Sequence, residues 1–281
     1  MRFEGKRVVL TGGASGIGKA TAEAFIAEGA QVMMGDLNAE AGAAMAAESR
    51  YDNRLAFQKT DVTQEADITG LLDAAADHFG GIDILFNNAG AAGARKRIDE
   101  ISADEWDFTQ NLLLRSVALG IRHVVPHMRK AGGGAIVNTA SITAHEAGWG
   151  PIAYSVAKAG VMHLSKIAAA ELAQHNIRVN SISPGFILTN IFADAMKDEG
   201  EAMARAVDGA MRGAAPQAQP VHRAGMPDDI AQTVLHLASE QGSFITGIDI
   251  KVDGGMLVGP RHSWDPDTPG LIDALTQAPQ G

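Results

Sequence analysis

Tyr154 and Lys158 are the side chains of this sequence whose types and spacing best fit acid–base chemistry. Four residues apart on a helix, they would lie on one face, with the phenol and the ammonium pointing the same way. A free tyrosine has a pKa of about 10, too high for a base at neutral pH, and a nearby cation favours the phenolate. Lowering that pKa by roughly 3 units takes about 4 kcal/mol of differential stabilisation. The pair therefore predicts a general acid/base in a partly desolvated site.

The sequence around this pair predicts the elements that position it. Pro151 favours a helix that begins just before Tyr154, and the apolar run 135–140 predicts a strand that delivers Ser141. The alternative is a tyrosine and a lysine one turn apart on a solvated helix face, because short motifs often match by chance. Two observations favour the chemical interpretation. Tyr154 is one of only two tyrosines, and a second motif stands near the other end of the chain.

The composition limits the classes of protein that this chain can form. Its 281 residues, 46% hydrophobic and 20% charged, suit one large α/β domain or two small ones. The formal net charge of −10, without a long basic run, argues against nucleic acid and anionic membranes as partners. The chain lacks cysteine and its nine histidines show no paired ligand spacing, so we expect no metal. We see no signal peptide and no apolar run as long as a membrane span, so we expect a cytoplasmic location.

A glycine-rich turn near the N-terminus predicts an anion site. The apolar run 8–10 predicts a buried strand, and a helical pattern covers 19–28. Gly12, Gly16 and Gly18 lie between them, where glycine permits a tight turn and a close approach of pyrophosphate to the helix N-terminus. A plain strand-to-helix turn is the alternative, and the position after a strand and before a helix favours the dinucleotide site.

Asp36 predicts which dinucleotide binds. It ends a predicted strand at 31–35, close to where an acidic residue hydrogen-bonds the adenosine ribose. Its carboxylate would accept from both ribose hydroxyls and repel a 2′-phosphate, and neither Leu37 nor the Ala14–Ser15 pair supplies a cation for that phosphate. We therefore expect NAD rather than NADP, the alternative being that Asp36 caps the helix that begins near Ala39.

The remaining pattern alternates strands with helices and predicts one doubly wound Rossmann-type α/β domain, a parallel sheet of about seven strands flanked by helices on both faces. Polar residues follow several strands, where ligands bind in such sheets. Asn111 lies inside the long helix predicted for 102–130, where asparagine is only a middling helix former. The further predicted helices are 39–49 and 64–79, and the further strands are 55–59, 82–86, 177–182 and 245–252.

These motifs resemble the short-chain dehydrogenase/reductase family, in its single-domain branch with a Tyr-x-x-x-Lys active site, from about Arg2 to Met256. The resemblance implies that Tyr154 exchanges a proton with the substrate oxygen and that Lys158 lowers the Tyr154 pKa and holds the nicotinamide ribose. It also implies that Ser141 hydrogen-bonds the reacting oxygen and that Asn111 holds a water on a proton path. The cofactor-binding positions that it implies are Gly12, Ser15, Gly16, Ile17, Gly18, Asp36, Leu37, Asp61, Val62, Asn88, Ala89, Gly90, Tyr154, Lys158, Pro184, Gly185, Ile187 and Thr189.

The resemblance also implies a domain organisation and an assembly. We expect a catalytic domain over 1–257, with a lid of short helices and loops at about 189–222. The tail 258–281, which includes Trp264, is expected either at a subunit interface or as a frayed terminus. Family members are commonly homotetramers, so we expect a homotetramer, with a homodimer as the alternative.

The expected substrate pocket is apolar. By the family layout it includes Ala92, Ile142, Trp149, Phe186, Phe192 and Met196, although Trp149 and Met196 fit the core equally well, and its nearest polar candidates are His145 and Glu146. This predicts an NAD-dependent oxidoreductase for a secondary alcohol or ketone on a cyclic, aromatic or otherwise hydrophobic compound. The Tyr–Lys spacing favours carbonyl/alcohol chemistry over C=C reduction. The alternatives are a 3-oxoacyl or ketone reductase and a non-catalytic NAD-sensing protein.

Overall fold

A computed structural model of the chain describes residues 1–189, 200–214, 217–270, 272 and 276. Its centre is a parallel sheet of seven strands, which confirms the predicted doubly wound fold. The strands are β1 (Arg7–Thr11), β2 (Gln31–Asp36), β3 (Leu55–Lys59), β4 (Ile84–Asn87), β5 (Gly134–Thr139), β6 (Ile177–Pro184) and β7 (Asp249–Val252). Their order in the sheet is β3-β2-β1-β4-β5-β6-β7, so the winding reverses between β1 and β4, where such folds bind ligands.

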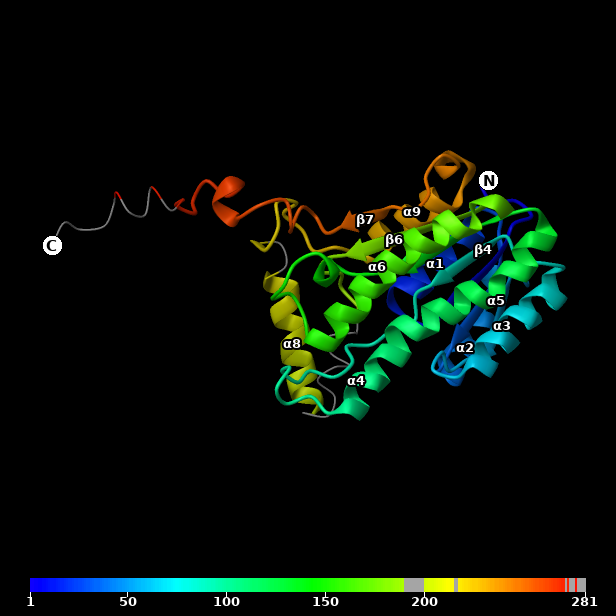
Figure 1. Ribbon diagram of the computed structural model, residues 1–281, viewed down its shortest axis with the longest axis horizontal. Helices are drawn as coiled ribbons and strands as arrows, with labels where there is room; N and C mark the ends of the chain where they lie inside the picture. The colour runs from blue at the N-terminus through cyan, green and yellow to red at the C-terminus, as the bar shows by residue number, and fades with distance from the viewer. Residues whose placement is uncertain (190–199, 215–216, 271, 273–275, 277–281) are drawn as a thin grey trace.

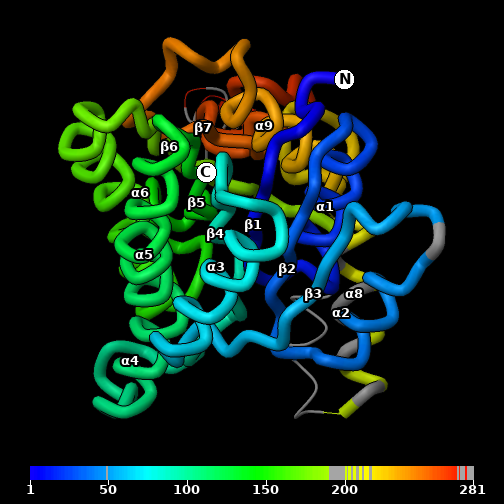
Figure 2. The backbone as a smooth tube through the Cα atoms, turned by 90° about the vertical axis from the view of Figure 1, so that its right-hand side faces the viewer, coloured from blue at the N-terminus to red at the C-terminus, as the bar shows by residue number. Residues whose placement is uncertain are grey.

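Helices cover both faces of the sheet, which is why its central strands read as apolar runs rather than as alternating patterns (Figures 1 and 2). One core cluster joins the sheet to α1 (Gly16–Ala27), α2 (Ala39–Ala46) and α9 (Pro227–Ala238). The other joins it to α3 (Glu65–Phe79), α5 (Ser116–Ala131) and α6 (Ile152–Leu172). The two layers hold the carboxyl ends of the strands in a fixed relation to one another.

The helix predicted for 39–49 ends earlier, at Ala46. The helix predicted for 102–130 is present over nearly its predicted extent, as α4 (Ala103–Gln110), a π-helical turn η2 (Asn111–Arg115) and α5, and it differs from the prediction in the π geometry of its middle turn. The capping box predicted at its start is present, because Ser102 and Glu105 exchange hydrogen bonds. The last strand begins at Asp249 rather than at 245, because Gly247 adopts a φ of 75° that no strand accommodates.

The predicted lid and tail lie beyond the sheet. In Figure 1 the helix α8 (Glu201–Ala214) lies past the carboxyl ends of the strands, on the side toward which the β6 arrow points. This helix is the part of the predicted lid that the structure describes as helical, and residues 190–199 and 215–216 of the lid lie outside the described residues. The segment after β7 runs away from the sheet and contains the short helix η8 (Arg261–Ser263). Within the described ranges, no helix is long and apolar enough to cross a membrane.

Candidate active site

The helix α6 carries the tyrosine–lysine pair as the spacing predicts. Pro151 stands immediately before the first helical residue, in an extended conformation that directs the chain into the helix. Tyr154 and Lys158 follow one turn apart, with the Lys158 Nζ atom 5.7 Å from the centroid of the Tyr154 ring. Because Ala153 and Ala157 are fully buried, this face of the helix packs closely and the pair points inward.

Lys158 is a buried cation with a single backbone partner. Its residue is 3% exposed, and its Nζ donates to the carbonyl oxygen of Thr139, at the end of β5, over 2.7 Å. Burial disfavours the charged ammonium and lowers the pKa of Lys158 to about 8. In the part of the chain that the structure describes, no carboxylate pairs with it to reverse this effect.

The pKa of the Tyr154 phenol moves in the opposite direction to the one expected from the sequence. Burial raises this pKa, and a hydrogen bond from the Ser141 hydroxyl, which favours the phenolate, offsets it only in part. The Lys158 Nζ atom is hydrogen-bonded to the Thr139 carbonyl rather than to the phenol. In the protein alone the phenol is therefore the stable form at neutral pH.

Ser141 lies between the end of β5 and the short helix η3 (Ile142–Ala144), of which it is the N-cap. Its backbone is extended, and its Oγ accepts from the amide of Thr143 over 3.2 Å. With this amide occupying one lone pair, the Ser141 hydroxyl proton remains available to the Tyr154 oxygen or to a substrate oxygen. Ser141, Tyr154 and Lys158 thus converge at the carboxyl end of β5.

Asn111 begins the π-helical turn between α4 and α5. A π turn inserts an extra residue into a helix, and such turns occur frequently at functional sites. The neighbouring Gln110 donates from its Nε2 to the carbonyl of Ala153 over 2.9 Å, which ties this joint to the start of α6. The Asn111 side chain is exposed, and its role in holding a water stays a prediction. An asparagine in an otherwise helical pattern was the one signal for the π turn that could be found beforehand.

The glycine turn has the backbone geometry that the predicted anion site requires. Gly12 and Gly16 have φ of 68° and 51°, which side chains rarely adopt. A Cβ on Gly18 would overlap the Gly12 carbonyl oxygen, and one on Gly12 would lie 2.9 Å from the Ala89 Cα atom. Ser15 is the N-cap of α1 but makes no side-chain cap, and the first turn, including Ile17, carries no acidic residue. The amides at this helix end therefore suit a pyrophosphate.

Asp36 lies at the carboxyl end of β2, beside the glycine turn. Its two carboxylate oxygens accept from the amides of Ala14 and Asn38, each over 2.9 Å. The cap of α2 is Asn38, which accepts from the Ala41 amide, so the alternative that Asp36 caps this helix is wrong. Leu37 is 63% exposed and offers no charge to a ribose phosphate.

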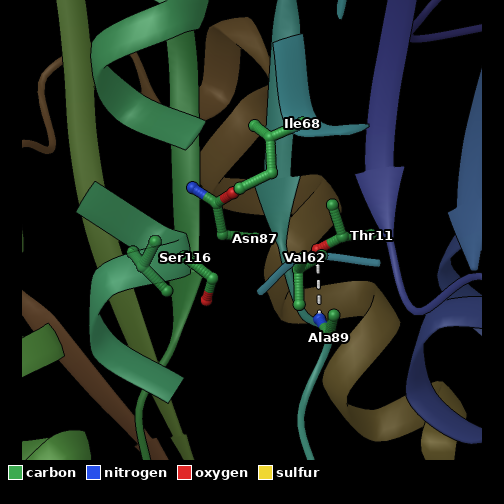
Figure 3. A pocket seen from close by; sticks show the side chains of 7 residues that line it. Thr11, Val62, Ile68, Asn87, Ala89 and Ser116 are labelled. Atoms are coloured by element: carbon green, nitrogen blue, oxygen red, sulfur yellow. Dashed lines mark hydrogen bonds between the residues drawn. The ribbon is translucent and has the colours of Figure 1, made fainter. Parts of the chain in front are cut away.

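The ends of β3 and β4 complete the nucleotide side of the cleft. The Asn88 side-chain amide donates to the carbonyls of Thr11 and Gly12 over 3.1 and 3.2 Å, and the Ala89 amide donates to Thr11 Oγ1 over 3.1 Å (Figure 3). These bonds fix the segment that runs into Gly90. The Asp61 carboxylate accepts from the amide and hydroxyl of Thr63. A cavity of about 10 Å³, room for one water, lies beneath and is lined by Thr11, Val62, Ile68, Asn87, Ala89, Ser116 and Val117.

The segment after β6 approaches the glycine turn from the other side. A Cβ on Gly16 would lie 3.2 Å from the Thr189 Cγ2 atom, so these two segments face each other closely. Gly185 donates from its amide to the Val252 carbonyl, and Ile187 pairs with Gly225 in an isolated parallel bridge. Pro184, at the end of β6, begins this segment. The structure thus brings both predicted ends of the dinucleotide site together.

The predicted substrate residues are brought together in part. Trp149 and Phe186 make an edge-to-face contact, with centroids 6.3 Å apart and planes at 75°. Trp149 is 38% exposed, so its alternative assignment to the core is wrong. Ile142 is buried and Ala92 is partly buried. Phe192 and Met196 lie outside the described residues.

Two groups near the site have contacts that the sequence did not predict. The Thr139 carbonyl, rather than a side chain, is the partner of Lys158. The His145 Nε2 atom lies 2.9 Å from Asp249 Oδ2 and 3.2 Å from Ser183 Oγ. No spacing rule could find a pair 104 residues apart, although the presence of His145 shortly after Ser141 was a signal.

Comparisons with known proteins agree with this fold. Residues 12–257 match the family model described as enoyl-(acyl carrier protein) reductase. The chain is 38% identical to 3beta-hydroxysteroid dehydrogenase 2 of Eggerthella lenta over 253 residues, 89% of this chain and 94% of that protein. It is 36% identical to cis-4-hydroxycyclohexanecarboxylate dehydrogenase of Sinomonas cyclohexanicum over 253 residues, 90% of this chain and 97% of that protein. A crystal structure of levodione reductase superposes with a TM-score of 0.83 at 33% identity, covering 92% of this chain and all of that one.

The fold, the glycine turn and the Ser–Tyr–Lys arrangement define a nicotinamide-dependent oxidoreductase. The chain belongs to the short-chain dehydrogenase/reductase family.

Proposed function

We propose that this protein is an NAD-dependent oxidoreductase that transfers a hydride between a secondary alcohol or ketone and the nicotinamide. The observation that carries the proposal is the convergence of Ser141, Tyr154 and Lys158 at the end of β5, in a fold whose glycine turn suits a dinucleotide. All the catalytic side chains implied by the family are present, which argues against a protein that only senses NAD.

The chain's own residues would bind the cofactor and move the proton. The amides at the start of α1 would hold the pyrophosphate, and bound NAD would supply the hydride chemistry. In oxidation, the hydroxyl proton of the alcohol passes to the Tyr154 oxygen while Ser141 donates a hydrogen bond to the same substrate oxygen. In reduction, the Tyr154 phenol gives its proton to the oxygen that was the ketone. Lys158 would hold the nicotinamide ribose from the same helix.

A preference for NAD over NADP rests on Asp36. Its carboxylate lies at the end of β2, beside the glycine turn, and can accept further hydrogen bonds because each oxygen carries more than one lone pair. A 2′-phosphate brought to the same place would meet this negative charge, and the neighbouring Leu37 supplies no cation. The ordinary NAD ribose hydroxyls would instead donate to it.

A cyclic or otherwise hydrophobic substrate is favoured by the aromatic contact of Trp149 with Phe186, in which Trp149 is 38% exposed. The names of two relatives, a hydroxysteroid and a hydroxycyclohexanecarboxylate dehydrogenase, describe hydroxyl groups on rings. Both names describe alcohol rather than C=C chemistry, as the Tyr–Lys spacing also suggests.

A second candidate, a 3-oxoacyl or ketone reductase, is favoured by one observation. The raised pKa of Tyr154 keeps the phenol protonated at neutral pH, and this form is the acid that ketone reduction needs. Alcohol oxidation needs the phenolate, so its rate should rise with pH more steeply than that of ketone reduction.

We also propose that 1–257 is the catalytic domain, with α8 in its lid, and that the protein is a cytoplasmic homotetramer, or alternatively a homodimer. The support is the family resemblance and the segment after β7, which runs away from the sheet (Figure 1). A sedimentation boundary at the monomer mass would contradict the assembly.

The test of function is a matrix of substrates and cofactors followed by nicotinamide absorbance. Cyclic and aromatic secondary alcohols, free sugars and hydroxyacyl thioesters are each offered with NAD and with NADP, and the matching ketones with NADH and NADPH. We expect turnover with NAD and bulky apolar alcohols. Turnover only with sugars or acyl thioesters would contradict the proposed substrate class. NADH binding without any turnover would favour a sensing protein.

A further inference from the structure

Two contacts join the loop after Ser141 to the segment that begins near the end of β6. His145 lies against Ser183 and Asp249, and Trp149 lies against Phe186. Ser183 and Phe186 flank Pro184–Gly185, the point where the proposed nicotinamide segment begins. The loop that carries the Ser141 hydroxyl and the Trp149 ring is thus attached on two sides to the other wall of the site.

The chemistry of the polar contact fixes its direction. A carboxylate only accepts, so the His145 Nε2 atom must carry a proton and donate it to Asp249 Oδ2 over 2.9 Å. The other oxygen of Asp249 accepts from the Ser181 hydroxyl over 2.6 Å, which holds the carboxylate in place. The Asp249 side chain is 8% exposed and that of His145 is 22% exposed, so the carboxylate end of this hydrogen bond is buried while the His145 end reaches the surface.

The other hydrogen bonds of the loop do not reach the sheet. Within the described residues, the amides of Thr143, Ala144, His145 and Glu146 all bond to Ser141 or Ile142. From Glu146 to Gly150 the loop is exposed, and Gly148 has a φ of 94°. The His145 side chain is therefore the polar tether between this loop and strands β6 and β7.

We propose that His145, oriented by Asp249, is a positioning residue that holds the loop 141–151 against β6 and β7. This tether keeps the Ser141 hydroxyl and the Trp149 ring in register with the segment 184–189. The inference deepens the proposed function and rests on it for its kinetic consequence. His145 exchanges no proton with the substrate in this role and acts through Ser141 and Trp149.

The first arm of the test needs no turnover. In a Trp106→Phe/Trp264→Phe background, Trp149 is the sole indole of a chain with three tryptophans, and acrylamide quenching reports its exposure. His145→Ala should raise the quenching constant about two-fold, because the loop opens locally. His145→Asn, too short to reach Asp249, should do the same, whereas His145→Gln restores an Nε2–H donor and should restore the original value.

His123→Ala is the matched control. The His123 Nε2 atom lies 2.8 Å from Glu65 Oε1 on the helices α5 and α3, and the His123 side chain is 23% exposed, close to the 22% of His145. His123→Ala removes a similar histidine–carboxylate contact, but one between α5 and α3 rather than in the loop 141–151. It should leave Trp149 quenching unchanged.

The second arm uses an alcohol that the wild-type enzyme turns over. His145→Ala and His145→Asn should raise KM for the alcohol about ten-fold and lower kcat, while the Kd for NADH changes less than two-fold. His145→Gln should recover both kinetic constants. A general loss of folding would instead weaken NADH binding and lower the melting temperature in parallel with activity.

The outcomes separate this inference from the proposed function. Unchanged Trp149 quenching in both His145→Ala and His145→Asn overturns the tether, whatever the enzyme catalyses. Increased quenching without turnover by the wild-type protein supports the tether and contradicts the proposed function. Increased quenching that His145→Gln fails to reverse assigns the effect to ring packing and overturns the role of the Nε2–Asp249 hydrogen bond.

Discussion

The two halves of the site are built in different ways. On the nucleotide side, between β1 and β4, backbone amides and glycines form the surface, and the Asp36 and Asn88 side chains have hydrogen-bond partners nearby. On the catalytic side, between β5 and β7, the Lys158 cation is buried with one carbonyl partner. In the described residues on this side, the buried hydroxyls of Thr139 and Thr143 have no hydrogen-bond partner.

The two sides therefore contribute differently to the stability of the folded protein. Glycine turns and satisfied polar groups cost the folded protein little, so the nucleotide side can be rigid before any ligand arrives. The buried Lys158 cation destabilises the folded state at neutral pH, but Lys158 and Tyr154 are the groups whose protonation a reaction can change. The catalytic side should therefore gain stability when its groups are removed, and the nucleotide side should not.

The substitution with the largest expected effect is Tyr154→Phe, on the catalytic side. It removes the group that we propose exchanges a proton with the substrate oxygen, so kcat should fall by about 10²–10⁴-fold. NADH binding, measured by fluorescence titration, should stay within two-fold of wild type, because the glycine turn and Asp36 are untouched. Substantial residual turnover would remove Tyr154 as the acid/base.

The other tyrosine supplies a control. Tyr51 is 4% exposed and donates from its hydroxyl to Glu23 Oε1 over 2.9 Å, away from the strand ends. Tyr51→Phe loses a comparable buried phenol, so it should lower the melting temperature slightly and leave kcat per folded molecule unchanged. A similar loss of kcat in both variants would mean that Tyr154→Phe acts through folding.

The second substitution, Asp36→Ala, addresses the nucleotide side. Hydrogen bonds to a charged group are worth about 1.5–3 kcal/mol, so the ratio of kcat/KM for NAD over NADP should fall on the order of 10–100-fold. Both cofactors are measured with one alcohol at low ionic strength. Glu40→Ala removes a nearby charge from the first turn of α2 and should change the ratio little. Equal use of NADP by the unmodified protein would refute the Asp36 argument directly.

The same comparison explains what could be predicted from the sequence. Gly12, Gly16 and Asp36 were predictable because glycine at a strand-to-helix turn and an acid at a strand end have local causes. The positions of Tyr154 and Lys158 also followed from helical spacing. The direction of their pKa shifts did not, because both shifts are caused chiefly by burial among residues that are distant in the sequence.

Other features of the catalytic side depend on tertiary contacts that no local pattern encodes. The π-helical turn at Asn111 replaces a run that reads as one continuous helix, and it is tied to α6 through Gln110. The partner of His145 is on the last strand, at Asp249. The strand order that brings these residues together follows from the fold class, but their side-chain contacts require the structure.

The smallest expected effect is a gain in stability from Lys158→Met, measured without nucleotide. The lysine pKa falls from 10.5 to about 8 in the folded protein, which corresponds to roughly 3 kcal/mol of destabilisation at pH 7. Methionine removes this penalty and loses the hydrogen bond to the Thr139 carbonyl, worth about 1 kcal/mol. The free energy of unfolding should therefore rise by roughly 1–2 kcal/mol at pH 7, a few degrees in melting temperature, while turnover is lost.

The pH dependence of this gain identifies its cause. Below about pH 8 both the folded and the unfolded lysine carry the proton, so the full penalty applies to the wild-type protein. Between about pH 8 and pH 10.5 the unfolded state binds more protons than the folded state. The wild-type protein therefore gains stability as the pH rises through this range, and the stability advantage of Lys158→Met becomes smaller. Lys166→Met, at an exposed position of the same helix, should show neither the gain nor its pH dependence. If the stability advantage of Lys158→Met stayed constant from pH 7 to 10, its cause would be better packing of the methionine side chain. The buried charge of Lys158 would then not explain the difference between the catalytic side and the nucleotide side.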